Sequence, residues 1–180
     1  MEKNRIRKAT LFYIPLLFLL SNCTYETPAD TQAEEDVEHI QKAVCEFYPA
    51  EGYEARGTVT FTEADTGIQV HVTMMGLTPG DHGFHVHQLG DCTAPDASSA
   101  GGHFNPHNTE HGAPTDSIRH VGDLGNIYAN ETGVVNVEFV DTMIAFEGEN
   151  SIIGRSVVVH KGKDDFESQP SGDAGARVAC

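Results

Sequence analysis

The sequence predicts an all-β domain built as an antiparallel sandwich or barrel. From Lys42 onward, apolar and polar residues alternate with a period of two, and no sustained helical period follows. The alternating stretches are short, contain β-branched residues and are separated by Gly, Pro, Asn and Asp. Several such strands at regular spacing are typical of sandwiches and barrels.

Each alternating stretch is expected to form one strand. The clearest are residues 57–62, 68–73, 133–140 and 156–160, and a shorter apolar stretch covers residues 84–87. Two segments break the pattern: residues 90–123 are rich in Gly, Pro, Asn, Asp and His, and residues 161–176 have a similar character. Long segments without regular structure are usually functional in a compact domain, so we expect two long functional loops.

The N-terminal residues 1–22 are expected to be an export signal peptide. Basic residues at 3–8 lead into an apolar run at 11–20, which is too short to cross a bilayer. The sequence Leu20-Ser-Asn-Cys23 resembles the lipobox of bacterial lipoproteins, which implies lipidation of Cys23. Plain cleaved secretion and an uncleaved anchor are the alternatives.

Residues 23–41 are then a lipidated acidic tether, and residues 42–180 are the folded domain. This arrangement predicts a cell-envelope protein held to a membrane through an N-terminal lipid anchor. Under the sorting rule for Gram-negative lipoproteins, Thr24 implies the outer membrane, with the protein facing the periplasm. An exported protein meets oxidising conditions, so two of Cys45, Cys92 and Cys180 could form a disulfide, and the residues alone do not choose the pair.

The charge of the chain excludes one class of partner. The sequence has 11 Lys and Arg against 27 Asp and Glu, a formal net charge of −16. So acidic a surface repels phosphate backbones, and we therefore expect no nucleic-acid binding.

Ten histidines in this acidic chain indicate a metal site. In His85-Val-His87 the alternation of a strand places both imidazoles on one face of the sheet. His160 ends another strand and could reach the same face. His103, His111, His120 and Asp123 fall in or beside the first loop. For any one of these residues a solvated or backbone-bonded histidine is the simpler explanation, but that explanation does not account for all of them together.

The ligand types also indicate which metals are bound. Imidazole-rich sites without thiolate suit Cu(II), whereas three nitrogens with one carboxylate suit Zn(II). Seven ligand residues for two four-coordinate ions require that one residue is shared. A histidine imidazolate can be this shared ligand, because both of its ring nitrogens can bind metal.

Five motifs make the chain similar to a known family. They are Gly83-Phe-His-Val-His87, Gly102-His-Phe-Asn-Pro106, Arg119-His-Val-Gly-Asp-Leu-Gly-Asn126, Gly154-Arg-Ser-Val-Val-Val-His160 and Gly175-Ala-Arg-Val-Ala-Cys180. In residues and in spacing they strongly resemble the copper/zinc superoxide dismutases, and the resemblance covers residues 42–180. It implies a Greek-key β-sandwich or flattened barrel of immunoglobulin-like architecture.

The resemblance implies a role for each matching residue. The copper ligands would be His85, His87, His103 and His160; the zinc ligands would be His103, His111, His120 and Asp123, with His103 as the bridge. Asp164 would hydrogen-bond one ligand histidine on each metal, and Arg177 would lie beside the copper. Cys92 and Cys180 would form the disulfide, which leaves Cys45 as a buried thiol in the first strand.

The implied reaction is the conversion of superoxide to oxygen and hydrogen peroxide by alternate reduction and reoxidation of copper, with zinc in a structural role. His103 would carry a proton and Arg177 would hold the anion. Lys161, Lys163 and, less favoured, Arg155 are further candidates for cations that attract it. The alternative function is a non-catalytic envelope protein that buffers or delivers copper and zinc.

The remaining features receive structural interpretations. His82 is expected to be structural, His71 and His107 to lie on the surface, and His39 to belong to the tether. The chain stops at Cys180, earlier than relatives usually do, so the oligomeric state stays open with a homodimer as one expectation.

Overall fold

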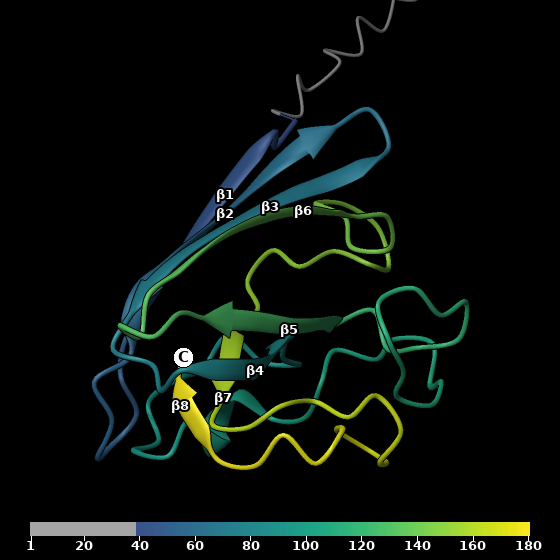
Figure 1. The fold of residues 1–180 in the computed structure, drawn as a ribbon. Coiled ribbons are helices and arrows are strands. Elements are labelled where there is room, and N and C mark those ends of the chain that lie inside the picture. Colours follow the sequence, from purple (N-terminus) through teal and green to yellow (C-terminus); the bar gives the residue numbers. More distant parts are fainter. Residues whose placement is uncertain (1–38) are drawn as a thin grey trace, which may run out of the picture. The chain divides into compact units, whose positions relative to one another are not determined.

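Two four-stranded antiparallel sheets form the two layers of the domain in the computed structural model, which describes residues 39–180 (Figure 1). The strands are β1 (Lys42–Phe47), β2 (Arg56–Ala64), β3 (Gly67–Met75), β4 (Gly80–Val86), β5 (Asp123–Ala129), β6 (Val135–Asp141), β7 (Val157–His160) and β8 (Arg177–Ala179). Apart from a 3-10 turn at Ser98–Ala100, the described residues form strands and loops. The predicted all-β antiparallel sandwich is confirmed.

The chain crosses between the two sheets at residues 76–79, 130–134 and 142–156. The first sheet has the order β1-β2-β3-β6 and the second the order β5-β4-β7-β8. Strands that are not consecutive in the chain therefore lie side by side, β6 beside β3 and β7 beside β4, as in Greek-key folds. The second of these pairings is important for function, because it places His160 beside the strand that carries His85.

Alternation along the strands produces the core between the sheets. In β3 the side chains of Ile68, Val70, Val72 and Met74 are buried, and the residues between them are half-buried or exposed. Each apolar side chain buried in this way contributes about 1.5–3 kcal/mol to folding. In β4, Phe84 faces the same core. His85 therefore points to the opposite face of the second sheet.

Loops cover that outer face of the second sheet. All four residues of β7 are buried, and Val158 packs against Ala97, Ala100 and Cys180 instead of the main core. The segments 90–122 and 161–176 contain no strand, and the 3-10 turn is the only regular element in them, as the sequence predicts. Histidines on this face are thus enclosed between a sheet and two loops.

The implied disulfide is confirmed. Cys92 and Cys180 are bonded, with 5.8 Å between their Cα atoms, and they close a segment with a sequence separation of 88. A cross-link of this span stabilises the fold by roughly 4–5 kcal/mol on the chain-entropy account. Cys45 is unpaired within the described chain, but it is half-buried where a buried thiol was expected. Burial raises the pKa of its thiol.

The histidines outside the predicted metal ligands lie mostly as expected. His82 is buried, with its ring nitrogens 2.7 Å from the carbonyl oxygen of His160 and 2.8 Å from that of Thr78, so it is structural. His71 and His107 are exposed and each bonds to a neighbouring asparagine.

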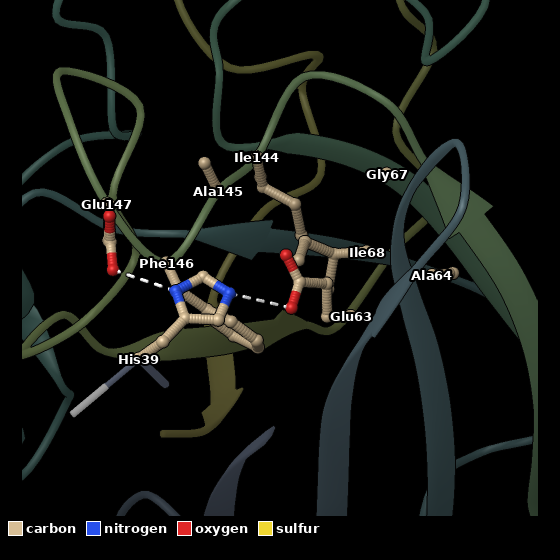
Figure 2. Close-up of a pocket in the computed structure, with 9 residues that line it drawn as sticks. All are labelled: His39, Glu63, Ala64, Gly67, Ile68, Ile144, Ala145, Phe146 and Glu147. Atoms are coloured by element: carbon tan, nitrogen blue, oxygen red, sulfur yellow. Dashed lines mark hydrogen bonds and ion pairs between the residues drawn. The ribbon is translucent and has the colours of Figure 1, made fainter. Parts of the chain in front are cut away.

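His39 differs from the expectation of a solvated tether. Its ring lies between two carboxylates, with Nε2 2.8 Å from Glu63 and Nδ1 3.0 Å from Glu147 (Figure 2). The hydrogen bonds to Glu147 and Glu63 raise the pKa of His39. The end of the predicted tether therefore contacts the domain, because the acidic side chains of β2 and a neighbouring loop bind the histidine.

The predicted signal peptide, Cys23 and nearly all of the tether lie outside the described residues. Within residues 39–180, no helix is long and apolar enough to span a membrane.

Candidate metal centre

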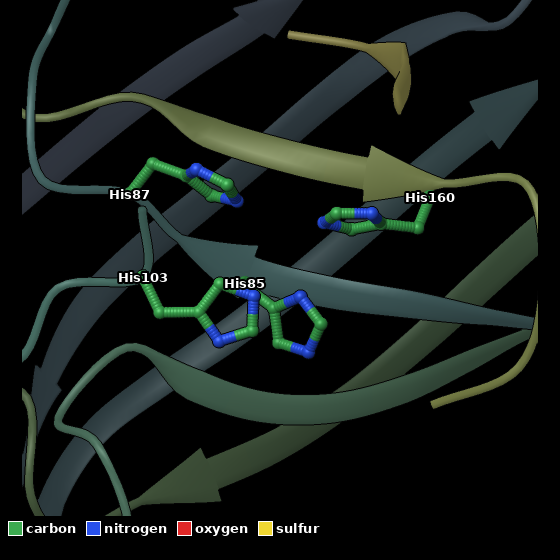
Figure 3. Close-up of side chains that lie close together, drawn as sticks. All are labelled: His85, His87, His103 and His160. Atoms are coloured by element: carbon green, nitrogen blue, oxygen red, sulfur yellow. The ribbon is translucent and has the colours of Figure 1, made fainter. Parts of the chain in front are cut away.

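Four histidines converge on the outer face of the second sheet. We call His85, His87, His103 and His160 the tetrahistidine group. His85 lies in β4 and His160 ends β7, whereas His87 and His103 are joined by an isolated bridge just beyond β4. The ring centre of His85 is 4.0 Å from that of His103 and 5.0 Å from that of His160 (Figure 3). One ring nitrogen from each of the four lies within 4.8 Å of the others.

Hydrogen bonds to fixed acceptors orient three of these rings. His87 bonds through Nδ1 to the Gly101 carbonyl oxygen at 2.9 Å, and His160 through Nδ1 to that of Gly175 at 3.0 Å. His85 bonds through Nε2 to Asp164 at 2.7 Å. The second nitrogen of each ring is buried and has no hydrogen-bond partner among residues 39–180; these are Nδ1 of His85 and Nε2 of His87, His103 and His160.

The environment keeps these imidazoles neutral. Burial lowers the pKa of His85 to about 3, of His87 to about 2 and of His160 to about 4. It also lowers the pKa of His103. A neutral ring that donates from one nitrogen presents a lone pair on the other. Four buried lone pairs that converge without a donor fit a metal ion, and the all-imidazole set suits copper.

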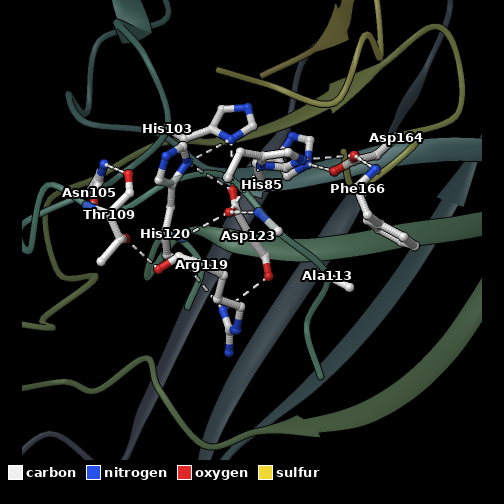
Figure 4. Close-up of polar contacts among 12 residues, drawn as sticks. His85, His103, Asn105, Thr109, Ala113, Arg119, His120, Asp123, Asp164 and Phe166 are labelled. Carbon is white, nitrogen blue, oxygen red and sulfur yellow. Dashed lines mark hydrogen bonds and ion pairs between the residues drawn. The ribbon is translucent and has the colours of Figure 1, made fainter. Parts of the chain in front are cut away.

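A second group shares His103. It consists of His103, His111, His120 and Asp123, and we call it the histidine–aspartate group. Asp123 is fully buried at the start of β5. One carboxylate oxygen lies 2.8 Å from Nδ1 of His103 and 3.2 Å from Nδ1 of His120 (Figure 4). The other lies 3.0 Å from Nδ1 of His111. Three nitrogens and one carboxylate fit a zinc ion.

The carboxylates change the protonation of this group. Burial by itself would raise the pKa of Asp123, but hydrogen bonds from His103, His111 and His120 outweigh burial and hold that pKa well below its usual range. Burial would likewise lower the pKa of His111, but Asp123 and Asp164 together raise it to about 9. In the metal-free protein His111 therefore carries a proton at neutral pH.

His103 lies between the two groups. Its Nδ1 atom is 2.8 Å from Asp123 and 3.5 Å from Nδ1 of His120, whereas its Nε2 atom is among the unpaired nitrogens of the tetrahistidine group. One ring thus presents one nitrogen to each set of ligands. The family resemblance implied this shared position for His103.

Asp164 connects the groups through a second route, as expected. Its Oδ2 lies 2.7 Å from Nε2 of His85 and its Oδ1 lies 2.9 Å from Nε2 of His111. The side chain of Asn126 in β5 holds Asp164 in place: Nδ2 donates to the Asp164 carbonyl at 2.9 Å, and the Asp164 N–H donates back at 2.8 Å. Gly172 packs so closely that a Cβ there would lie 1.7 Å from Oδ1 of Asp164.

Arg119 is a supporting residue whose role the sequence did not reveal, although it lies within a quoted motif. It is buried behind the histidine–aspartate group, where Nη1 donates to the carbonyl oxygens of His120 at 3.2 Å and Asp123 at 3.0 Å. Nη2 donates to Asp141 at 2.6 Å. The guanidinium thus fixes the main chain that carries two of the four ligands.

A pocket of about 420 Å³ opens onto the tetrahistidine group. Its described lining includes His87, His103, His160 and Arg177, but neither Lys161 nor Lys163. Lys163 lies instead 3.8 Å from an exposed aspartate.

Two arginines were candidates for attracting the anion, and the structure separates them. The guanidinium of Arg155 stacks 3.5 Å from the ring centre of Phe104 and donates to the Gln88 carbonyl, which is a structural role. Arg177 lines the pocket, and its guanidinium donates to the carbonyl oxygens of Ala97 at 2.5 Å and Gly101 at 2.6 Å. Of the predicted cations in the described chain, Arg177 alone lies at the pocket.

Comparisons with known proteins agree with this geometry. The family model described as copper/zinc superoxide dismutase (SODC) matches residues 55–180. The extracellular superoxide dismutase [Cu-Zn] of Drosophila melanogaster is 46% identical over 135 residues, which cover 71% of this chain and 74% of that protein. The solved structure of the clock protein EA4 superposes with a TM-score of 0.72 at 40% identity, covering 78% of this chain and 91% of that chain.

Proposed function

The chain belongs to the copper/zinc superoxide dismutase family, and from that premise we propose that its tetrahistidine group binds copper and its histidine–aspartate group binds zinc. The protein is an oxidoreductase that acts on superoxide, with copper and zinc as its cofactors. The proposal goes further by assigning each ion to one group and a structural role to zinc. The position of His103, with one nitrogen in each group, carries this assignment.

Bound copper would supply the one-electron chemistry, because it can be reduced by one superoxide anion and reoxidised by the next, whereas zinc has no redox chemistry. The residues of the chain supply binding and protons. A guanidinium has five N–H donors, and those that do not bond to the Ala97 and Gly101 carbonyls are available for an anion in the pocket. Arg177 would therefore hold superoxide by charge-assisted hydrogen bonds.

His103 is suited to handle the proton. Its Nε2 atom belongs to the tetrahistidine group beside the pocket and has no hydrogen-bond partner in the described chain, whereas its Nδ1 atom is hydrogen-bonded to Asp123. A proton held at Nε2 in place of the metal would lie where the product peroxide needs one. Asp123 fixes the orientation of the ring, so the proton would be presented in a constant direction.

Replacing Arg177 tests the assignment of the substrate position. We expect Arg177→Ala to keep its copper content, measured by metal analysis, and to lose roughly 10- to 100-fold in rate, the equivalent of a charge-assisted hydrogen bond of about 1.5–3 kcal/mol. Arg56→Ala is the matched control, since Arg56 is exposed in the other sheet. An unchanged rate in Arg177→Ala would show that the substrate binds elsewhere.

The alternative, a non-catalytic envelope protein that buffers or delivers copper and zinc, needs no arginine in the pocket. The family relation also favours the enzyme. Protein loaded with both metals should remove superoxide from a steady flux. Tight copper binding with the flux untouched would favour the alternative.

We also propose that the mature protein is a lipoprotein of the cell envelope, anchored at Cys23 to the outer membrane and facing the periplasm. The basic and apolar N-terminal residues and the lipobox-like sequence support this proposal. Mass spectrometry of the exported protein should find acylated Cys23 as its first residue, and Cys23→Ser should appear in the soluble fraction. An unmodified, membrane-free wild-type protein would contradict the anchor.

A homodimer is the proposed assembly. Val44 and Ile153 line one small pocket on the surface, and they are 58% and 41% exposed. Association through this surface would cover them. Sedimentation at micromolar concentration should give the mass of two chains, and Val44→Glu should give the mass of one; a wild-type monomer would contradict the proposal.

A further inference from the structure

His111 is held by the loop of residues 161–176 through its main chain as well as through its ring. The amide N–H of His111 donates to Oε1 of Gln169 at 2.8 Å, and Nε2 of Gln169 donates to the His111 carbonyl oxygen at 2.9 Å. The carboxamide of Gln169 thus satisfies both polar main-chain groups of one residue. The ring of that residue belongs to the histidine–aspartate group.

The tip of this loop is folded by contacts that do not involve His111. Asp165 accepts hydrogen bonds from the N–H groups of Glu167 at 2.9 Å and Ser168 at 2.8 Å, and from the Ser168 hydroxyl at 2.6 Å. The N–H of Gly172 closes the turn on the Ser168 carbonyl at 2.7 Å. Gln169 therefore projects from a turn whose geometry the loop sets by itself.

The ring of His111 has little freedom to move. Its Nε2 lies 2.9 Å from Asp164 on one side, and its Nδ1 lies 3.0 Å from Asp123 on the other. A shift of the His111 main chain by an ångström would lengthen one of these contacts beyond hydrogen-bond distance. The ring position consequently depends on how firmly the main chain is held.

We propose that Gln169 is a positioning residue for the histidine–aspartate group: by pairing with the main chain of His111, it keeps the ring between Asp123 and Asp164. The inference rests on the proposed function, because it takes His111 to be a zinc ligand. Residues that hydrogen-bond to metal ligands typically account for about 10- to 100-fold in metal affinity. Gln169 has the same effect through the peptide groups of the ligand residue.

The test is a zinc titration of the full chain against a chromophoric chelator, with zinc as the metal. Gln169→Ala should bind zinc about 10- to 100-fold more weakly than the unaltered chain. Hydrogen exchange at the His111 amide should also be faster in its metal-free form. Gln69→Ala is the matched control, since Gln69 lies in β3 of the other sheet and makes no side-chain hydrogen bond within the described chain; its zinc affinity should be unchanged.

Gln169→Glu gives a second variant in case the alanine variant does not fold. A carboxylate can still accept from the His111 N–H but cannot donate to the His111 carbonyl, so its zinc affinity should lie between those of Gln169→Ala and the unaltered chain.

His111→Ala separates the two ways in which the inference can fail. If His111→Ala loses zinc while Gln169→Ala and Gln169→Glu bind it within about twofold of the unaltered chain, the inference is wrong and the proposed zinc site stands. If His111→Ala itself binds zinc normally, the proposed zinc site is wrong and the inference falls with it.

Discussion

The two metal-type groups share one histidine and differ in charge. In the tetrahistidine group the ligand rings are neutral, since burial lowers the pKa of His85, His87 and His160 to between about 2 and 4. In the histidine–aspartate group, neighbouring carboxylates raise the pKa of His111 to about 9. Burial acts on both groups, but His111 contacts two carboxylates, Asp123 and Asp164, whereas His85 contacts Asp164 alone and keeps a lowered pKa. Two carboxylates beside one imidazole therefore outweigh its burial, and a single carboxylate does not.

Loss of the shared ring should have the largest effect. His103→Ala removes one ligand from each group, so we expect both metals to bind more weakly and the rate to fall by more than the roughly 100-fold that an outer hydrogen-bond partner accounts for. Metal analysis and a superoxide assay on the same preparation measure both. His71→Ala, on the exposed face of the other sheet, is the control. Loss of only one metal in His103→Ala would mean that the ring serves one group alone.

Removing the carboxylate of Asp123 should lower the metal affinity of the two groups unequally. Asp123→Asn keeps the shape of the side chain but removes its charge, so zinc affinity should fall by more than about 100-fold, since a ligand is lost and not merely its partner. Copper affinity should change by less than about tenfold. Chelator competition with each metal separately measures both. Equal losses for the two metals would contradict the separation of the groups.

The affinities for zinc and for copper should depend differently on pH. At neutral pH zinc must displace a proton from His111, so zinc affinity should rise up to about tenfold per pH unit between pH 7 and the His111 pKa of about 9, and then level off. His85, His87 and His160, whose pKa values burial lowers to about 4 or below, are already neutral at pH 7, so copper affinity should stay nearly flat over this interval. Chelator titrations at several pH values, corrected for the chelator, give both slopes. Parallel slopes would contradict the assigned protonation states.

The stability of the metal-free protein should depend on pH in two opposite ways. The lowered pKa values of His85, His87 and His160 contribute stability that is present above the unfolded value of about 6.5 and is lost as the pH falls toward about 4 and below. The raised pKa of His111 contributes stability that is present below about 6.5 and is lost as the pH rises through about 9. Urea unfolding of the metal-free chain should therefore show lower stability at pH 5 and at pH 9.5 than near pH 7. A stability that increases steadily across this range would refute the assignment.

The sequence predicted much of this arrangement because strand alternation is a local property. The stretches at 57–62 and 68–73 became β2 and β3, and the alternation in residues 84–87 correctly predicted that His85 and His87 lie together. The metal ligands were predicted by the family resemblance, which rests on the identity and spacing of the motif residues. The structure brings those residues into two groups.

The supporting residues could not be predicted from the sequence, because their partners are main-chain groups far away in the chain. Gln169 bonds to the peptide groups of His111, and Arg119 bonds to carbonyls whose direction only the folded loop determines. Lys161 and Lys163, which the sequence offered as cations that attract the anion, are not among the described residues that line the pocket. Side-chain direction in an irregular loop does not follow from any periodicity.

The central claim is that the ring of His103 joins two metal ions, and electron paramagnetic resonance of the protein loaded with Cu²⁺ in both groups tests it directly. Cu²⁺ binds nitrogen and oxygen ligands more tightly than Zn²⁺, so it should fill the histidine–aspartate group as well. If one imidazolate links the two ions, their unpaired spins couple through it and the integrated signal falls well below two spins per chain. A full two-spin signal, with metal analysis confirming two copper ions per chain, would contradict the account.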